Sequence, residues 1–396
     1  MAQLSLARKG FSIRTLTNHW FWRAVLFPVA LTRLCQIIAI NLSQVFQIYN
    51  HPGLTSWNSG LDRFITSWAR WDSGWYLSII DRGYFLQGPI SEVQSNIAFY
   101  PLFPYLVKLL SWPVFSLIPK TTVLIAVGVL LSNLFLLGAL FFLYKLILHV
   151  FDDADLAERS IFYILVFPTA FFFSCFYTES TFFFFAVAGF YYAMKGRWVL
   201  ACMMAAFTSI ARPLGVMIVL PLGLIYLEKI HWNFRRIKAD VLFLSLAPAA
   251  LLAHMVSLYP VTGDLLAIFK IQSKWDKRIS TPWETLLNTD HIPEYYTQGI
   301  MDIDRLSLIL FLLLAVVCLV KFRSLSFGAF PLVILTPVLF TGTVISATRY
   351  ALPMFPCFIL LAQYGKNPYI HKLILVVLPT IQILFIAAWS QFYWVQ

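Results

Sequence analysis

The chain alternates long apolar runs with short polar links, a pattern typical of a protein that crosses a membrane many times. A spanning helix needs about 20 apolar residues, and fewer where a segment is kinked or crosses only part of the bilayer. The candidate membrane helices on this criterion are residues 21–46, 122–148, 159–176, 180–194, 198–211, 213–227, 241–259, 306–320, 327–344, 350–364 and 372–391. The pattern predicts an all-α polytopic membrane protein, with residues 1–396 forming one membrane domain of about 11 transmembrane helices.

A different pattern occupies residues 70–84, shortly after the first apolar run. If this stretch is read as a helix, one stripe carries Trp68, Trp71, Asp72, Trp75, Tyr76, Ile79 and Ile80. Trp and Tyr prefer the boundary between lipid headgroups and hydrocarbon, so the stripe predicts a helix that lies along the membrane surface. Asp72 falls inside the aromatic face, whereas Asp81 projects from the opposite face and is expected to contact water.

Composition supports a membrane protein and argues against several other classes. Hydrophobic residues make up 60% of the chain, charged residues only 12%, and the mean hydropathy is +0.77. The net charge of +11 is spread between the apolar runs, which favours anionic lipids over nucleic acid as partners. The five cysteines show no CxxC spacing and the seven histidines no metal-ligand spacing, so neither a zinc site nor another metal site is indicated.

Basic residues in the short loops predict the orientation of the chain. A cytoplasmic N-terminus brings these residues to the cytoplasmic side: Arg8, Lys9, Arg14, Lys195, Arg197, Lys229, Arg235, Arg236, Lys238, Lys321, Arg323, Lys366 and Lys372. Residues 98–118 are apolar but rich in proline, and a crossing there would invert every later loop, so we expect a re-entrant or interfacial segment. Two long extracytoplasmic loops, residues 49–120 and 260–305, then share one face with Glu179, Arg212 and Arg349.

Five short motifs occur together and in order along this framework. They are Arg70-Trp71-Asp72 with Tyr76 and Gly83-Tyr84, Ala98-Phe99-Tyr100-Pro101-Leu102-Phe103-Pro104, Phe173-Ser174-Cys175-Phe176-Tyr177-Thr178-Glu179-Ser180, Ala211-Arg212-Pro213-Leu214-Gly215, and Arg349-Tyr350-Ala351-Leu352-Pro353-Met354-Phe355-Pro356. In these motifs the chain resembles the PIG-V family of mannosyltransferases, which belongs to the GT-C superfamily of multispanning glycosyltransferases. Residues 263–268, with Gln272 and Trp275 behind them, are similar to a segment of its prokaryotic branch.

The resemblance implies a GT-C-like bundle with interfacial helices in the first extracytoplasmic loop. Such enzymes move a sugar from a polyprenyl (dolichyl-type) phosphate carrier to a hydroxyl of a lipid-linked or glycan acceptor, with inversion at the anomeric carbon. The resemblance implies that the sugar is mannose. They use no nucleotide sugar and no bound cofactor, and the chain has neither GxGxxG nor a P-loop. A prokaryotic plasma membrane is expected, or the ER membrane if the chain is eukaryotic.

The resemblance also implies roles for individual residues. Asp72 would be the catalytic base, and arginines would hold the carrier phosphate. The expected substrate-binding residues are Arg70, Trp71, Tyr76, Glu179, Arg212, Gln272, Trp275, Arg349 and Tyr350.

Each of these residues also has a plainer interpretation. Asp72 could be a helix N-cap, Glu179 a solvated acid in a turn, and the two arginines could extend to the lipid headgroups. Gln272 and Trp275 could belong to an amphipathic surface helix. The charged run Lys274, Asp276, Lys277 and Arg278 is expected to be a solvated face.

Two other functions compete with a glycosyltransferase. A secondary transporter or lipid flippase would show broken helices in two related halves, but the sequence has one clear break, at Arg212-Pro213, and no similarity between halves. A non-catalytic subunit of a glycosylation assembly would keep the fold without needing the base. The presence of Asp72 in its aromatic frame argues against that alternative.

Overall fold

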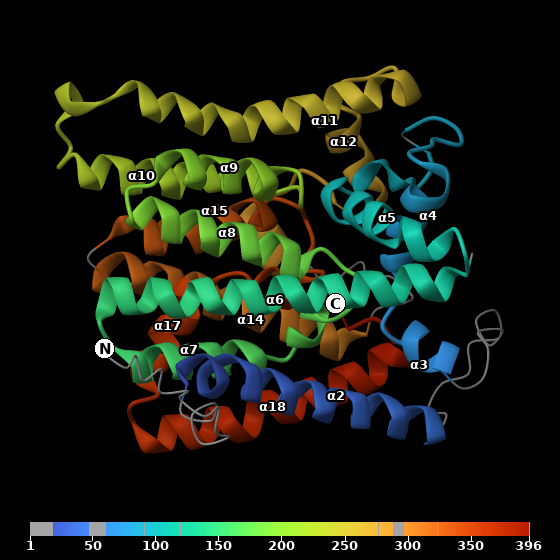
Figure 1. Ribbon diagram of the computed structural model, residues 1–396, viewed down its shortest axis with the longest axis horizontal. Coiled ribbons are helices and arrows are strands. Elements are labelled where there is room, and N and C mark those ends of the chain that lie inside the picture. Colours follow the sequence, from blue (N-terminus) through green and yellow to red (C-terminus); the bar gives the residue numbers. More distant parts are fainter. Residues whose placement is uncertain are drawn as a thin grey trace, which may run out of the picture.

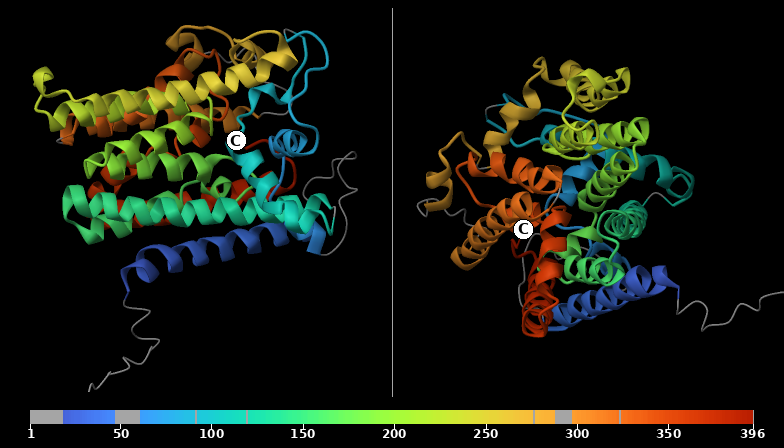
Figure 2. Two further views of the ribbon diagram at one scale, coloured as in Figure 1. Left: turned by 45° about the horizontal axis from the view of Figure 1, so that its top comes forward. Right: turned by 90° about the vertical axis from the view of Figure 1, so that its left-hand side faces the viewer.

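The computed structural model describes residues 19–46, 61–90, 92–118, 120–275, 277–287, 297–322 and 324–395. Within these ranges the chain folds into an all-helical bundle whose long helices run side by side (Figure 1). Helix α6 crosses the whole width of the bundle in its middle, α11 lies along one edge, and α2 and α18 form the opposite edge. The views in Figure 2 show the same arrangement from the side and from one end. The predicted helical fold is therefore confirmed.

The first half of the chain supplies the central helix α6, helices on both sides of it and the short helices at the right of Figure 1. Its helices are α2 (Phe27–Phe46), α3 (Leu61–Thr66), α4 (Ser73–Arg82), α5 (Leu102–Phe115), α6 (Thr121–Phe151), α7 (Ala154–Leu165) and α8 (Glu179–Met194). A π-helical turn, Trp22–Leu26, leads into α2, and two short 3-10 turns are Asn96–Ala98 and Ala170–Phe173.

The second half adds the remaining helices. They are α9 (Trp198–Ser209), α10 (Val219–Lys229), α11 (Leu246–Thr262), α12 (Ala267–Lys270), α13 (Pro282–Leu287), α14 (Gln298–Lys321), α15 (Leu325–Leu339), α16 (Ala347–Tyr350), α17 (Phe355–Tyr364) and α18 (Pro368–Ser390). Its 3-10 turns are Gly215–Ile218, Phe234–Arg236, Ala239–Ser245 and Ile271–Trp275.

Among the described residues, five helical stretches are long and apolar enough to cross a membrane: Trp22–Val45, Thr121–Phe151, Ala239–Thr262, Gln298–Lys321 and Pro368–Ser390. Each of the other predicted segments also contains a helix, but one too short to be counted with these five. The segment predicted at 159–176 differs most, because α7 ends at Leu165. Pro168 follows closely and cannot donate to a helical hydrogen-bond ladder. The count of about 11 crossings therefore rests on the shorter helices and stays a prediction.

The predicted break at Arg212-Pro213 is confirmed. Helix α9 ends at Ser209, and α10 begins at Val219 after a 3-10 turn. Gly215 makes this sharp reversal possible, since a Cβ atom there would lie 1.9 Å from the carbonyl oxygen of Thr208. The two short helices form a hairpin whose bend carries Arg212.

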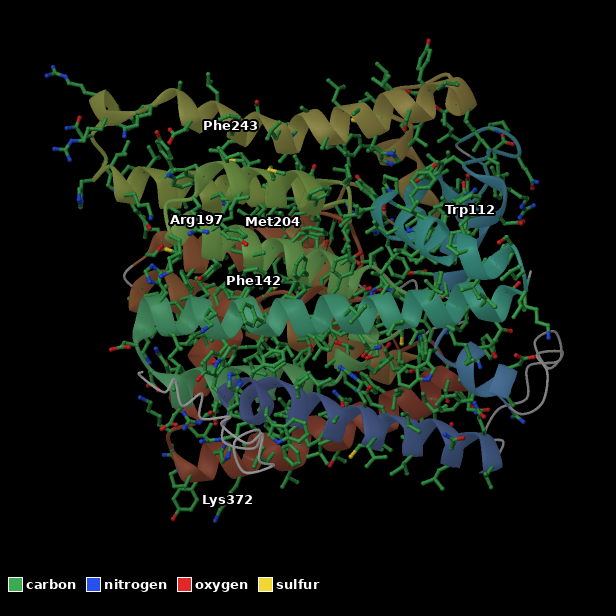
Figure 3. The ribbon with its side chains drawn as sticks, viewed as in Figure 1. Trp112, Phe142, Arg197, Met204, Phe243 and Lys372 are labelled. Carbon is green, nitrogen blue, oxygen red and sulfur yellow. The ribbon has the colours of Figure 1, made fainter. Side chains whose placement is uncertain are left out.

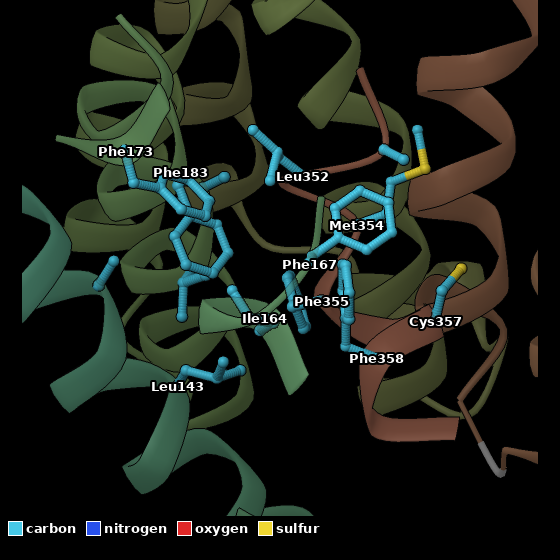
Figure 4. Close-up of a cluster of buried hydrophobic side chains, with 14 of the residues drawn as sticks. Leu143, Ile164, Phe167, Phe173, Phe183, Leu352, Met354, Phe355, Cys357 and Phe358 are labelled. Carbon is cyan, nitrogen blue, oxygen red and sulfur yellow. The ribbon is translucent and has the colours of Figure 1, made fainter. Parts of the chain in front are cut away.

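A continuous aromatic core supports the bundle below the bend. Figure 4 shows Phe173 and Phe183 stacked on one side of it and Phe355 and Phe358 on the other. The ring centroids of Phe173 and Phe183 lie 5.1 Å apart, and Phe167 meets Phe358 edge to face. Such pairs fix side-chain orientation beyond what hydrophobic burial alone would achieve. The core thus holds the helices that carry the loops in fixed positions.

The loops and short helices gather at one end of the bundle. Helices α3, α4, α5 and α12 lie at the right of Figure 1. The predicted topology requires Arg197 and Lys372 to lie at the other end, and Figure 3 shows both toward the side opposite Trp112 of α5. These two residues therefore lie at the end that the predicted topology requires, while the assignment of each end to a compartment stays a prediction.

Candidate functional site

Asp72 directly precedes α4 and does not lie within a continuous helix. The predicted helical stripe over residues 68–80 is wrong in its first part, because α4 begins at Ser73 and Trp71 has a φ of 51°. This left-handed conformation, unusual for a bulky residue, interrupts the helix and turns the backbone. From Trp75 onward the stripe is correct, with Tyr76, Ile79 and Ile80 buried. Asp81 has a side chain that is 75% exposed, as predicted.

The carboxylate of Asp72 is part of a buried chain of four charges. Arg349 Nη1 lies 3.0 Å from Asp72 Oδ2, and its Nε lies 3.1 Å from Glu179 Oε1. The same Glu179 oxygen accepts a hydrogen bond of 2.7 Å from Arg212 Nη1. The side chains of these residues are between 1% and 12% exposed. Two acids and two arginines from four separate motifs therefore neutralise one another inside the fold.

These contacts decide between several interpretations of the sequence. Asp72 occupies the N-cap position of α4, but its side chain makes no capping hydrogen bond. Glu179 is the first residue of α8 and buried, so it is not a solvated acid in a turn. Arg212 and Arg349 point to carboxylates inside the protein and do not extend to the headgroups. The plainer interpretations of Glu179, Arg212 and Arg349 are therefore wrong, and that of Asp72 is correct in position but without a side-chain capping bond.

The backbone around Asp72 is held by the motif that contains Glu179. Tyr177 Oη accepts a hydrogen bond from the Asp72 N–H and donates one to the Arg70 carbonyl oxygen, at 3.2 and 2.9 Å. Ser73 Oγ donates to the Phe176 carbonyl oxygen at 3.1 Å. Residues 68–76 and 173–180, which are far apart in the sequence, thus form one unit.

Arg349 is positioned by a third acid that the sequence analysis did not single out. Asp304 of α14 accepts hydrogen bonds from the N–H groups of Ser346 and Thr348, at 3.0 and 2.7 Å. Ser346 has a φ of 68°, a strained value for serine, and directly precedes α16. Thr169 Oγ1 donates to the Thr348 carbonyl oxygen at 3.1 Å. Together these contacts aim the guanidinium of Arg349 at Asp72.

Three of the four charged residues, Asp72, Arg212 and Arg349, border a small polar cavity of about 100 Å³. Seven residues expected from the sequence line it: Asp72, Tyr76, Arg212, Gln272, Trp275, Arg349 and Tyr350. Glu179 lies behind the wall through its ion pairs. Arg70 and Trp71 do not line it. Arg70 instead bonds to the backbone at Ser390, and Trp71 packs against Trp394.

A larger apolar groove of about 510 Å³ adjoins the polar cavity. Its walls include Leu214, Phe269 and the α15 residues Ile334 and Val338. The residues that line both spaces, and so form the junction between them, are Arg212, Pro213, Gln272, Lys277, Thr343, Ile345 and Tyr350. The site is thus a polar cavity that continues into an apolar groove.

Lys277 occupies this junction, so its predicted place on a solvated face is wrong. It is half-buried, and its Nζ atom lies 3.0 Å from Gln272 Oε1 and 3.4 Å from Tyr350 Oη. Among the described residues no carboxylate lies within ion-pair distance of it. The side chain of its neighbour Asp276 is outside the described residues.

Lys270, which also lines the groove, differs from Lys277. It forms an ion pair with Asp264 in the same loop. The hydrogen bonds from Lys270 and from the Leu266 N–H lower the pKa of the Asp264 carboxyl, so this acid is ionised at neutral pH. The charge of Lys270 is therefore balanced locally, whereas no acid in the described part of the chain balances that of Lys277.

Lys277, Asp304 and Trp394 contribute to this region, but the sequence analysis gave none of them a role in the site. None stands in a motif of the recognised kind, and only the scarcity of acids in the chain could have marked Asp304. Their importance to the site arises from contacts between distant segments.

Comparisons with known proteins identify solved structures with a similar fold. No curated protein sequence matches the chain. The solved oligosaccharyltransferase of Archaeoglobus fulgidus in its apo form has 12% sequence identity and a TM-score of 0.50, covering 94% of this chain and 56% of that one. The oligosaccharyltransferase AglB of the same organism, in complex with an inhibitory peptide and a dolichol-phosphate, has 13% identity and a TM-score of 0.45, covering 95% and 56%. The chain thus spans just over half the length of these proteins, and at this identity the similarity concerns the fold alone.

The sequence itself carries the assignment to a family. The family model described as mannosyltransferase (PIG-V) matches residues 19–270, more than half of the chain. The matched range contains Asp72, Glu179 and Arg212. The chain belongs to the PIG-V family of mannosyltransferases.

Proposed function

We propose that this mannosyltransferase transfers a mannosyl group from a polyprenyl-phosphate carrier to a hydroxyl of a lipid-linked or glycan acceptor, on the extracytoplasmic face of a membrane. The single observation that carries the proposal is the position of Asp72, whose carboxylate is held by Arg349 at the wall of a polar cavity that opens into an apolar groove. A substrate with a sugar, a phosphate and a long apolar chain needs both spaces in this order.

Asp72 acts as the base in this proposal. Its carboxylate accepts the proton of the acceptor hydroxyl while the hydroxyl oxygen attacks the anomeric carbon. The bond between that carbon and the phosphate oxygen breaks, the configuration inverts, and polyprenyl phosphate leaves as an anion. Arg349 balances the charge of Asp72 and fixes one of its oxygens, so the carboxylate is oriented before substrate arrives.

The apolar groove receives the carrier chain. The apolar side chains in its wall, those of Leu214, Phe269, Ile334 and Val338, shield an isoprenoid from water. The carrier phosphate then lies where the groove meets the polar cavity, beside Lys277.

Lys277, rather than Arg212 or Arg349, supplies the main positive charge for this phosphate. Arg212 is paired with Glu179, and Arg349 with both Asp72 and Glu179, so their charges are already balanced. Among the described residues, Lys277 is near neutral oxygens only, those of Gln272 and Tyr350. Such an ammonium group, placed where the apolar groove meets the polar cavity, favours the binding of an anion. It also stabilises the negative charge of the departing phosphate.

The Lys277→Ala substitution is expected to raise the KM for the donor. Loss of a charged hydrogen bond costs about 1.5–3 kcal/mol, which corresponds to roughly ten- to a hundredfold. Steady-state transfer with varied donor concentration measures this effect. Lys274→Ala is the matched control, because Lys274 belongs to the same loop but lines neither the cavity nor the groove. An equal donor KM for wild type and Lys277→Ala would contradict the phosphate assignment.

The function itself is tested with purified protein in lipid nanodiscs, radiolabelled polyprenyl-phosphate mannose and a lipid extract as acceptor. We expect label to pass into a product that survives the mild acid that cleaves the donor. The same carrier bearing glucose tests the choice of sugar. Failure to transfer any sugar, combined with movement of the carrier across vesicle membranes, would instead support a transporter.

A further inference from the structure

The chain beyond α18 turns back into the molecule. Phe392 N–H donates to the Trp389 carbonyl oxygen at 3.0 Å, and Tyr393 N–H donates to the Ala388 carbonyl oxygen at 3.1 Å. This pair of bonds is a Schellman turn, in which the residue after the cap has a positive φ. Phe392 fills that position with a φ of 65°, where glycine is usual. The strained turn therefore needs support from outside its helix.

The Arg70-Trp71 pair gives that support. Arg70 Nε donates to the Ser390 carbonyl oxygen at 3.1 Å, and its guanidinium lies 4.3 Å from the ring centroid of Phe392. Trp71 meets the Trp394 ring edge to face, with centroids 4.8 Å apart. Val395, the next residue, is only 3% exposed. The segment Phe392–Val395 is thus packed against the residues that immediately precede Asp72.

Trp394 lines the polar cavity together with Asp72. Neither residue lines the apolar groove, whereas Lys277 and Gln272 line both spaces. An inverting displacement requires the attacking hydroxyl and the leaving phosphate on opposite sides of the anomeric carbon. If the phosphate lies by Lys277, the acceptor approaches from the side of Asp72 and Trp394.

We propose that Trp394 is an acceptor-binding residue, whose ring packs against the apolar face of a polyhydroxylated six-membered ring, a sugar or a cyclitol, in the acceptor headgroup. This inference rests on the proposed function. The flat indole offers a rigid apolar surface of the size of such a ring, and Tyr76 and Trp275 complete an aromatic lining around it. The hydroxyls at the edge of the ring then face Asp72. Arg70 and Trp71 are positioning residues, because they act through the segment that bears Trp394.

The test compares Trp394→Ala and Trp394→Phe with wild type in nanodiscs. With n-octyl α-D-mannopyranoside as acceptor, Trp394→Ala is expected to raise the acceptor KM about tenfold, equivalent to about 1.4 kcal/mol, and to leave the donor KM unchanged. Trp394→Phe keeps an aromatic ring and the fold. Its acceptor KM is expected to lie between those of wild type and Trp394→Ala. Trp112→Ala is the matched control, because Trp112 is 71% exposed on α5 and lines neither space.

A binding measurement separates this inference from the proposed function. Saturation-transfer NMR with methyl α-D-mannopyranoside, in the absence of donor, is expected to give ring-proton signals that Trp394→Ala reduces and Trp112→Ala does not. If wild type transfers no sugar but its NMR signals still depend on Trp394, the ring-binding site is supported and the proposed reaction is contradicted. Signals independent of Trp394, or a change in donor KM alone, would overturn the inference.

Discussion

Asp72→Asn is expected to lower the turnover number of mannosyl transfer about 10²- to 10⁴-fold, with little change in the amount of folded protein. The amide cannot accept the proton of the acceptor hydroxyl, although it keeps the size and shape of the side chain. The donor KM is expected to stay near the wild-type value, because the proposed phosphate contact at Lys277 is unaffected. Single-turnover transfer from radiolabelled donor measures the effect directly.

Asp81→Asn is the matched control for this substitution. Asp81 belongs to α4, the helix that follows Asp72, but its side chain is 75% exposed, and within the described ranges it forms only a surface ion pair with Arg82. Such pairs contribute little. Asp81→Asn should therefore transfer at the wild-type rate. Near wild-type turnover by Asp72→Asn would show that Asp72 has a structural role only, and the base would have to be sought elsewhere.

The local sequence predicts the helices of this protein better than it predicts the site. Apolar runs set the helical segments, and Pro213 marks the hairpin bend, because both effects act within a few neighbouring residues. The left-handed turn at Trp71 follows no local rule. It is stabilised by Phe392 and Trp394, more than 300 positions away, and no pattern near Trp71 reveals that contact.

The motifs identified most residues of the polar cavity but not their pairing. The resemblance of the motifs to the family predicted roles for Asp72, Glu179, Arg212 and Arg349. In the structure these four residues form one chain of ion pairs. That pairing changes the expected role of the arginines, because a guanidinium already matched to a carboxylate is less available to a phosphate. Lys277 was missed because a charged loop usually faces water, and only the fold of the second loop turns it toward the groove.

The central acid of this chain gives the largest expected change in stability. Glu179 Oε1 contacts both Arg212 and Arg349, and its side chain is 1% exposed. Glu179→Gln removes the negative charge and leaves Arg212 buried without an acidic partner among the described residues. Breaking one side of a buried pair typically costs about 3–5 kcal/mol. Unfolding of the purified protein by denaturant, followed by tryptophan fluorescence, measures the loss.

The surface pair Arg23–Glu158 provides a matched comparison, since its side chains are 58% and 30% exposed. Glu158→Gln is expected to cost less than about 1 kcal/mol. The double variant Glu179→Gln, Arg212→Gln removes both charges of the buried pair, and we expect it to recover part of the stability lost in Glu179→Gln. If Glu179→Gln were as mild as Glu158→Gln, the buried chain of charges would not support the fold. Recovery in the double variant without recovery of transfer would instead show that the chain supports the fold through charge balance and supports the reaction through the orientation of Arg349 and Asp72.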